Sequence, residues 1–399
     1  MSSPTDLLAE ITTVGADGAR GGYSRHVFDR SEHELREWFT GQAEKRGLQV
    51  TTDRNANVWA WWGEPAPDAV VTGSHLDSVP GGGAFDGPLG VACSLTAIDL
   101  LRAEGFEPSR PVAVSVFAEE EGSRFGVPCL GSRLLTGAID PDVARDLRDP
   151  DGVTFAEAMR SSGLAPDHVG RDDESLGRIG QFVELHVEQG RGLVDLDRSV
   201  AVASSILAHG RWRFRFRGQG NHAGATLMDD RSDPMLPAAQ LVSATRRAAF
   251  TRDGSRATVG RLVPTPGGTN VIASTVDVWL DARSEHGEHV GEIVGELTEV
   301  AQQIAVDEGC TVQVSEESYT PTVSFEAGFR DDLSGLLDAP TLPTGAGHDA
   351  GVLAATTPTA MLFVRNPTGI SHAPDEFAEA GDCLDGTRAL ARTLRHLAA

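Results

Sequence analysis

The stretch Ala69–Gly87 reads AVVTGSHLDSVPGGGAFDG and joins an apolar run to a glycine-rich loop. The run AVVTGSH predicts a short buried strand that ends at His75. Asp86 follows His75 by eleven positions, and the loop between them contains three consecutive glycines. A simple turn needs only one or two glycines. We therefore expect this loop to bend closely around something that His75 and Asp86 hold together.

The segments around this stretch alternate between helical and extended patterns. Strands separated by helices form largely parallel sheets with both faces covered, so the pattern predicts an α/β domain. Helices are expected at residues 33–47 and 90–105 and from about residue 378, a loop followed by a helix at 345–355, and strands at 111–121, 181–190 and 359–366.

The sequence changes in character between residues 209 and 324. RWRFRFRG (Arg211–Gly218) alternates strictly, which predicts a strand with one face in water. A helix, two strands, a helix and a strand follow, and this β-α-β-β-α-β order is typical of the ferredoxin-like split unit. We therefore predict an α/β catalytic domain over residues 1–208 and 325–399, interrupted by an inserted α+β lid and dimerisation domain over residues 209–324.

Composition limits the possible partners. The formal net charge of −24 over 399 residues argues against nucleic acid and anionic membrane surfaces, because both select basic patches. The four cysteines are scattered without a CxxC pair, which argues against a disulfide framework. The first residues lack the features of a secretion signal, and no run reaches eighteen apolar residues. A cytoplasmic protein is the expectation.

Residues with metal-binding side chains stand where several strands should end. Ligands bind outside the carboxyl ends of strands in open α/β sheets, so these side chains should meet at one edge. Three imidazoles with carboxylates suit zinc, with manganese, cobalt or nickel as alternatives, and five ligands are enough for two ions that share a carboxylate. The candidates are His75, Asp86, the triplet Glu119–Glu121, His186 and His372.

Each candidate also fits a structural role when taken alone. A single His after a buried strand is usually a hydrogen-bonding residue, and a Glu triplet is usually a solvated face. The triplet, however, ends an apolar run, where three carboxylates repel one another unless a cation is near. The coincidence of several such residues at strand ends favours the metal site.

Eight segments together resemble the binuclear metal amidohydrolases. This family includes N-carbamoyl-L-amino acid hydrolases, allantoate amidohydrolases and β-ureidopropionases, which are relatives of carboxypeptidase G. The resemblance extends over residues 70–380, in the family's order. The segments are GSHLDSVPGGGAFDGPLGV, AEEEGSRFGVPCLGSRLLTG, ELHVEQG, GNHAGATLMDDRSDP, GGTNVIAS, DARS, GAGHDA and GISHAPDE.

The resemblance implies a role for each metal-site residue. His75 and His186 would hold one ion, Glu121 and His372 the other, and Asp86 would bridge both. Asp77 would accept the remaining N–H of His75 and so orient its ring. Glu120 would be the general base, taking a proton from the attacking water and giving it to the leaving nitrogen.

The resemblance also implies substrate contacts and a homodimer. His222 would stabilise the oxyanion, and Arg283 would hold a substrate carboxylate. In this family the inserted domain forms the dimer, and some of its groups serve the neighbouring subunit. The further substrate contacts expected are Gln189, Asn270, Gly347 and His348. Taken alone, Asn270 also fits a turn cap and Arg283 a surface position.

Two positions depart from the family pattern. Leu227 stands where carbamoylases usually have Pro, which affects the lid hinge rather than His222. Arg365 and Asn366 replace smaller or uncharged residues shortly before His372. Arg365 is either a surface residue or a second cationic contact that favours a substrate with an extra carboxylate.

The sequence therefore predicts a two-metal amidohydrolase that cleaves the linear C–N bond of a small ureido or N-acyl amino acid. Allantoate and N-carbamoyl-L-amino acids are the leading substrates. The alternatives are an N-acyl acidic amino acid such as N-formylglutamate, and a di- or aminopeptidase reaction of the same superfamily. A metal-dependent binding protein without catalysis is disfavoured, since Glu120 and all five ligands are present.

Overall fold

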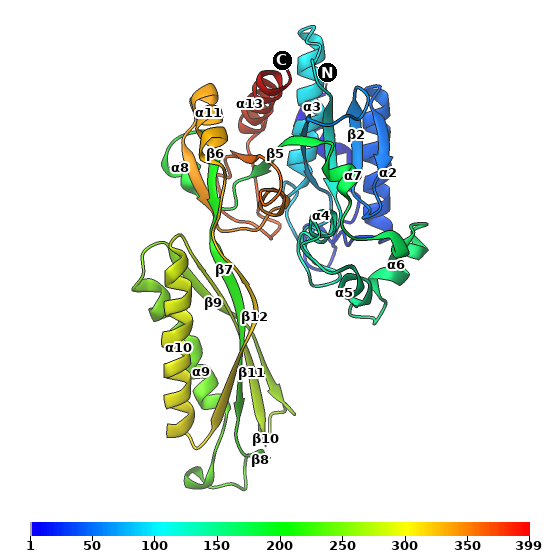
Figure 1. Cartoon of the computed structure of the whole chain (residues 1–399). Helices are drawn as coiled ribbons and strands as arrows, with labels where there is room; N and C mark the ends of the chain where they lie inside the picture. The colour runs from blue at the N-terminus through cyan, green and yellow to red at the C-terminus, as the bar shows by residue number, and fades with distance from the viewer. Residues whose placement is uncertain (1) are drawn as a thin grey trace. The chain divides into compact units, whose positions relative to one another are not determined.

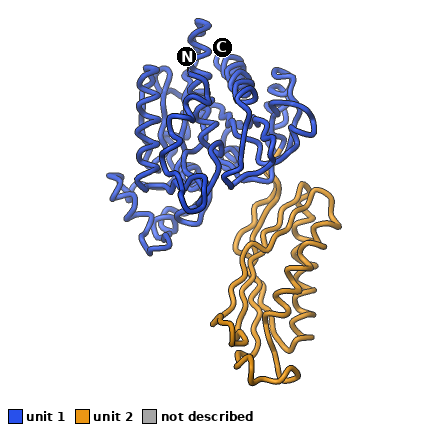
Figure 2. Tube along the Cα trace, turned by 180° about the vertical axis from the view of Figure 1, so that it is seen from behind, with its two compact units in different colours: residues 1–204, 324–399 blue, residues 205–323 orange. Residues whose placement is uncertain are grey.

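The computed structural model describes residues 2–399 and contains two compact units (Figure 2). Unit 1 comprises the chain up to Ser204 together with Ser324–Ala399. Unit 2 comprises Ser205–Val323. None of the helices in the described part of the chain is long and apolar enough to cross a membrane.

Unit 1 is built on a nine-stranded mixed sheet (Figure 1). The strand order is β1-β2-β4-β3-β5-β15-β6-β13, and β14 pairs with β6. Strands β4, β3, β5 and β15 run parallel, while β1, β2 and β6 pair antiparallel with their neighbours. The prediction of a mixed α/β fold with a largely parallel central sheet is confirmed. The strands are β1 (Gln49–Thr52), β2 (Val58–Trp62), β3 (Ala69–His75), β4 (Val112–Phe117), β5 (Ile179–Val187), β6 (Val200–Ile206), β13 (Val323–Ser324), β14 (Thr341–Thr344) and β15 (Thr359–Val364).

The central strands are apolar because both of their faces are buried. Every residue of β3, β4 and β15 is buried, as expected for parallel strands inside a domain. Helix α3 begins with Pro88, whose fixed φ and missing N–H suit a first helical turn. The main core combines α1, α2, α3 and α13 with the sheet. The helices of unit 1 are α1 (Pro4–Glu10), α2 (Arg30–Lys45), α3 (Pro88–Ala103), α4 (Leu130–Thr136), α5 (Pro141–Asp146), α6 (Phe155–Ser161), η1 (Pro166–His168), α7 (Asp173–Leu176), α8 (Gly192–Asp195), α11 (Ala327–Leu337), α12 (Asp349–Leu353) and α13 (Ala380–Ala398).

Unit 2 has a four-stranded antiparallel sheet in the order β12-β7-β11-β9. Residues Trp212, Phe214 and Phe216 of β7 are buried, and the arginines between them lie on the opposite face. Figure 1 shows α9 and α10 on the same side of this sheet, where they close a separate core. The elements are β7 (Ala208–Arg217), α9 (Met235–Phe250), β9 (Ser255–Thr265), β11 (Thr275–Ser284), α10 (Gly287–Asp307) and β12 (Thr311–Thr320), with a ribbon of β8 (Asn221–His222) and β10 (Val271–Ile272) and the short turn η2 (Met228–Asp230).

Candidate metal centre

Four neighbouring strands bring the expected ligands to one edge of the unit 1 sheet. Strands β4, β3, β5 and β15 are adjacent and parallel, so their carboxyl ends meet. His75 is the last residue of β3, and His186 is the penultimate residue of β5. Glu121 follows β4, and His372 follows β15. The strand order therefore gathers imidazole and carboxylate groups from four separate segments.

The carboxylate of Asp86 lies between these groups. Its Oδ1 atom is 3.1 Å from Nε2 of His186 and 3.6 Å from Nε2 of His75. Its Oδ2 atom is 3.4 Å from Nε2 of His372, which is 3.5 Å from Oε2 of Glu121. The ligand atoms of His75, Asp86 and His186 lie within 4.8 Å of one another, and so do those of Asp86, Glu121 and His372, so these two groups share Asp86. A carboxylate that bridges two ions requires this arrangement. A third group with the same spacing is formed by Glu184, His186 and His348.

In their neutral form, the two buried imidazoles of His75 and His186 direct the lone pair of Nε2 toward Asp86. Nδ1 of His75 is 3.1 Å from the backbone oxygen of Asp77, and Nδ1 of His186 is 2.9 Å from that of Val187. A carbonyl oxygen only accepts, so in a neutral ring Nδ1 carries the hydrogen and Nε2 is a free acceptor. Neither Nε2 atom has a hydrogen-bond partner among residues 2–399. Acceptors buried beside a carboxylate fit a divalent cation held between them.

The electrostatics of the cluster also fit a cation. Burial and the nearby Asp86 carboxylate raise the pKa of Glu121 well above its usual range. Burial alone would lower the pKa of His75, but the carboxylates of Glu120, Asp77 and Asp86 raise it. Both shifts arise because several carboxylates are held close together out of water, and a bound cation would offset their mutual repulsion. Nitrogen and oxygen donors of this kind suit zinc and its neighbours in the transition series.

Asp77 lies beside Nδ1 of His75, as expected. Its backbone oxygen is 3.1 Å and its carboxylate 3.5 Å from this nitrogen. The carboxylate also accepts hydrogen bonds from the backbone N–H groups of Glu120 and Glu121, at 3.2 and 3.1 Å. Asp77 therefore links the loop after β3 to the loop after β4.

Strand β4 ends earlier than the sequence pattern predicts. The strand was expected to continue to Glu121, but β4 ends at Phe117. Glu119 has a left-handed backbone with φ of 53°, and its carboxylate accepts two backbone N–H groups of the following turn. Oε2 of Glu120 then lies 3.6 Å from Nε2 of His75. This position, beside a predicted metal ligand, suits the predicted general base.

Two glycines of the opening loop allow close approaches. A Cβ atom at Gly87 would lie 2.5 Å from the ring of His75, and Gly87 also has a φ of 82°. A Cβ atom at Gly83 would lie 2.3 Å from Oε1 of Glu376. The loop therefore folds tightly around side chains of the site, as its glycine content predicted.

Glu376 was not singled out from the sequence. It is 3% exposed, and its Oε1 accepts hydrogen bonds from the backbone N–H groups of Phe85 and Asp86, at 3.1 and 2.8 Å. Its Oε2 accepts a hydrogen bond from Ser371 at 3.2 Å. Its position in the segment GISHAPDE, four residues after His372, is the sequence feature that could have indicated a role at the site.

Gln189 lies within the cluster. Its Nε2 atom donates to Oδ2 of Asp86 at 3.0 Å and to Oγ of Ser371 at 3.1 Å, and it is 3.4 Å from Nε2 of His372. Its buried Oε1 atom has no hydrogen-bond partner among the described residues. An amide oxygen in this position is an available acceptor for a substrate N–H group.

His348 lies beside the same cluster, directly after Gly347. It is 3% exposed, its ring centre is 4.5 Å from that of His186, and neither ring nitrogen has a partner within residues 2–399. Burial and His186 lower its pKa well below the usual range, so the ring is neutral.

Glu184, also not predicted, connects Ser74 Oγ and the N–H of Ala350, each at 3.0 Å. This bridge orients the start of α12 against β3 and β5.

In unit 2, the geometry of His222 favours a single tautomer. Its Nδ1 accepts hydrogen bonds from the backbone N–H groups of Gly224 and Ala225, at 3.0 and 3.2 Å. In the neutral ring the hydrogen is therefore on Nε2, which can donate. Asn270 lies in the same ribbon, because its backbone oxygen accepts the N–H of Ala223 at 3.0 Å.

Arg283 lies at the opposite end of the unit 2 sheet from this ribbon. It is the penultimate residue of β11, whose first residue Thr275 lies close to the ribbon. The length of this strand, on the order of 25–30 Å, separates Arg283 from His222 within one chain. The guanidinium of Arg283 donates to both carboxylate oxygens of Asp281, at 2.7 and 3.0 Å.

Arg365 has a partner inside the protein. Its Nε and Nη2 atoms donate to the two carboxylate oxygens of Asp382, at 2.9 and 3.0 Å, and Nη1 is 3.5 Å from Asp197. All three guanidinium nitrogens of Arg365 therefore face a carboxylate of the protein itself, which leaves no free edge for a second bidentate partner. This geometry argues against the predicted contact of Arg365 with an acidic substrate.

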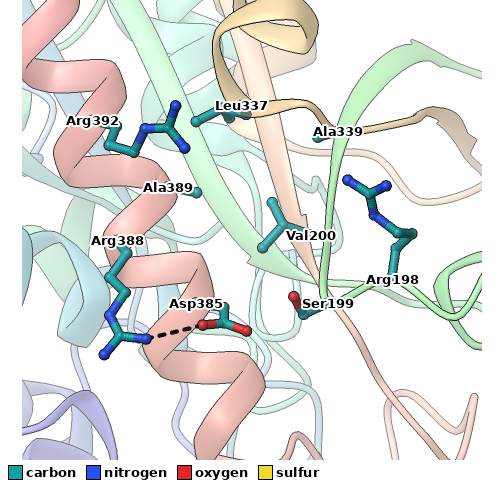
Figure 3. Close-up of a pocket in the computed structure, with 9 residues that line it drawn as sticks. All are labelled: Arg198, Ser199, Val200, Leu337, Ala339, Asp385, Arg388, Ala389 and Arg392. Atoms are coloured by element: carbon teal, nitrogen blue, oxygen red, sulfur yellow. Dashed lines mark hydrogen bonds and ion pairs between the residues drawn. The ribbon is translucent and has the colours of Figure 1, made fainter.

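A separate pocket lies between α13, the end of α11 and the start of β6 (Figure 3). It contains three arginines, but their donors have partners: Arg388 pairs with Asp385 at 3.2 Å, and Arg392 donates to the backbone oxygen of Leu336 at 2.6 Å. Arg198 likewise donates to the backbone oxygen of Asp338. The contacts of Arg392 and Arg198 stabilise the end of α11.

Two groups of three possible ligands share one carboxylate at the carboxyl edge of a parallel sheet, and such an arrangement suits the two-metal sites of hydrolytic enzymes. Residues 71–396 match the peptidase family M20/M25/M40, and the chain belongs to this family. Relatives that match it over the full length are amidohydrolases, and the chain is an amidohydrolase, as its motifs predicted.

Two amidohydrolases are similar to this chain over nearly its full length. The chain is 34% identical to an N-carbamoyl-L-amino acid amidohydrolase of Geobacillus stearothermophilus, covering 98% of this chain and 97% of that one. It is 30% identical to an allantoate amidohydrolase of Bacillus subtilis, covering 100% and 98%. A crystal structure of a hydantoinase/carbamoylase family amidase from Burkholderia vietnamiensis matches with a TM-score of 0.89 and 30% identity, covering 99% and 96%.

Proposed function

We propose that this enzyme hydrolyses the linear C–N bond of an N-carbamoyl-L-amino acid or of allantoate, using two divalent metal ions per subunit. The observation that carries the proposal is the position of Asp86, with His75 and His186 beside one oxygen and His372 beside the other. The names of the full-length relatives support the substrate class.

The residues present imply a division of work at the site. Ions held by His75, Asp86 and His186 and by Asp86, Glu121 and His372 would polarise the scissile carbonyl and acidify water. Glu120 receives the proton of the attacking water and delivers it to the leaving nitrogen. When the acyl group is carbamoyl, the products are an amine, carbon dioxide and ammonia.

Groups outside the metal centre would orient the substrate. The Nε2–H group of His222 donates to the oxyanion of the tetrahedral intermediate. The hydrogen bonds that Nδ1 of His222 accepts support this role, because they keep the ring hydrogen on Nε2. Gln189 and His348 face the ureido or amide group, and Asn270, Gly347 and Arg283 complete the substrate contacts. We assign no substrate contact to Arg365.

The separation of His222 and Arg283 supports a homodimer. A small substrate cannot contact two residues that are a full strand apart, so one of them would act on the substrate bound by a second copy. Unit 2 would then serve as lid and dimerisation domain, with closure over the substrate.

The four free, buried cysteines agree with a reducing compartment such as the cytoplasm.

The test is release of ammonia or amine from a substrate panel. Allantoate, N-carbamoyl-L-amino acids, N-formylglutamate and dipeptides are compared in the metal-free enzyme and after addition of Zn, Mn, Co or Ni. We expect ureido substrates to be turned over fastest, and only with metal. Chelator-insensitive turnover contradicts the mechanism, and faster hydrolysis of dipeptides favours the peptidase alternative.

A further inference from the structure

Cys129 contacts the proposed general base twice. Its backbone N–H donates to the carbonyl oxygen of Glu120 at 2.7 Å, and its Sγ atom lies 3.5 Å from Oε1 of the same residue. The side chain is 3% exposed, so water does not compete for this hydrogen bond. The other carboxylate oxygen, Oε2, lies 3.6 Å from Nε2 of His75. One oxygen of Glu120 therefore faces the thiol and the other faces the metal ligands.

The thiol is the donor in this contact. Burial raises the pKa of Cys129 well above its usual range, and the carboxylates of Glu120 and Asp349 raise it further. Cys129 therefore keeps its hydrogen at neutral pH, and the carboxylate of Glu120 accepts it.

The backbone of Cys129 is unusual for a residue with a side chain. Cys129 precedes α4 with φ of 55° and ψ of 36°, the left-handed region that favours glycine. A glycine would adopt this conformation without strain. Backbone conformations of this kind are common at functional sites.

We propose that Cys129 is a positioning residue: its thiol holds Oε1 of Glu120, so that Oε2 is the oxygen that exchanges protons with water and the leaving nitrogen. This role rests on the proposed function, in which Glu120 is the general base. The hydrogen bond itself does not depend on that function and is tested separately.

The first test is the infrared S–H stretching band of the metal-free protein. The difference between wild type and Cys129→Ala isolates the Cys129 band from the other three cysteines. A hydrogen-bonded S–H absorbs at lower frequency than a free one. We expect the band to move to higher frequency in Glu120→Ala and to stay in place in Glu44→Ala, an exposed helix residue. An unchanged band in Glu120→Ala overturns the contact.

The second test is steady-state kinetics of the metal-loaded enzyme. Loss of one hydrogen bond to a charged group predicts a decrease in kcat of about tenfold in Cys129→Ala, with KM within about twofold. Cys129→Ser, which keeps a donor, should recover part of the loss. Cys129→Gly relieves the backbone strain, so its Tm should not fall although its kcat does. Cys310→Ala, in unit 2, is the control.

The outcomes separate the two proposals. Unchanged kcat in Cys129→Ala and Cys129→Gly overturns the positioning role while leaving the proposed function intact. A fall in kcat that follows Tm across the three variants also overturns it, because the effect is then one of folding. If the wild type hydrolyses none of the panel substrates, the proposed function fails, and the infrared band alone decides the contact.

Discussion

The carboxylate of Glu376 accepts a 2.8 Å hydrogen bond from the backbone N–H of Asp86, a residue 290 positions away in the sequence. Glu376 also accepts a hydrogen bond from the hydroxyl of Ser371, the residue before His372. Glu376 therefore connects the proposed bridging ligand to the segment that carries His372, a proposed ligand of the second ion. Residues that orient metal ligands in this way typically contribute strongly to metal affinity.

Substitution Glu376→Ala should weaken metal binding by about 10–100-fold, because the backbone of Asp86 loses its acceptor. The affinity is measured by competition with a chromophoric chelator. Glu379→Ala, an exposed position three residues later, is the matched control and should bind metal as the wild type does. Equal affinities in the two variants would contradict the role of Glu376.

Substitution Glu120→Gln should lower kcat by about 10²–10⁴-fold, since an amide cannot receive the proton of the attacking water. The variant should retain two metal ions per chain, as measured by elemental analysis after dialysis. Loss of metal together with activity would instead make Glu120 a ligand.

Metal binding should weaken as the pH falls from about 7.5 to 5. In the metal-free protein, the surrounding carboxylates raise the pKa of His75 and of His186 against the opposing effect of burial. Each imidazole must release its proton before it coordinates, so protons compete with the metal more strongly at lower pH. Calorimetric titrations in buffers of different ionisation enthalpy count the released protons. Affinity independent of pH would show that these imidazoles do not coordinate.

Substitution Arg365→Ala should leave the preference between acidic and neutral substrates unchanged. It should lower the free energy of unfolding by about 1–3 kcal/mol, because the buried carboxylate of Asp382 loses its bidentate partner. Chemical denaturation and kcat/KM ratios measure the two effects. A selective loss of activity on N-carbamoylglutamate would show that Arg365 contacts acidic substrates.

Mixing Glu120→Gln with His222→Ala should restore activity if His222 acts on the site of the second copy. Each variant alone should be strongly impaired, by about 10²–10³-fold for His222→Ala. In a hybrid dimer, one of the two sites then has both residues, so random pairing recovers about a quarter of wild-type activity. No recovery after subunit exchange would place His222 and Glu120 of the same chain at one site.

Much of the fold and of the candidate site could be predicted from local patterns. Unbroken apolar runs between amphipathic helices indicated parallel strands buried on both faces, and β3, β4 and β15 have this burial. Parallel strands end at a common edge, so His75, His186 and Glu121 could be expected near one another before any distance was known. The end of β4 was predicted too late, because the left-handed turn at Glu119 follows an apolar run without a glycine.

The sequence by itself determined the family, the α/β architecture and the chemical type of the site, because strand periodicity and ligand type are properties of short segments. The tertiary structure alone decided which partner each polar group has. Arg365 faces Asp382, Asp77 faces the backbone of Glu120, and Cys129 faces the carboxylate of Glu120. The opening stretch shows the same division. Its glycines predicted a tight loop, but the close packing of Gly83 against Glu376 depends on contact between distant segments, which no local pattern contains.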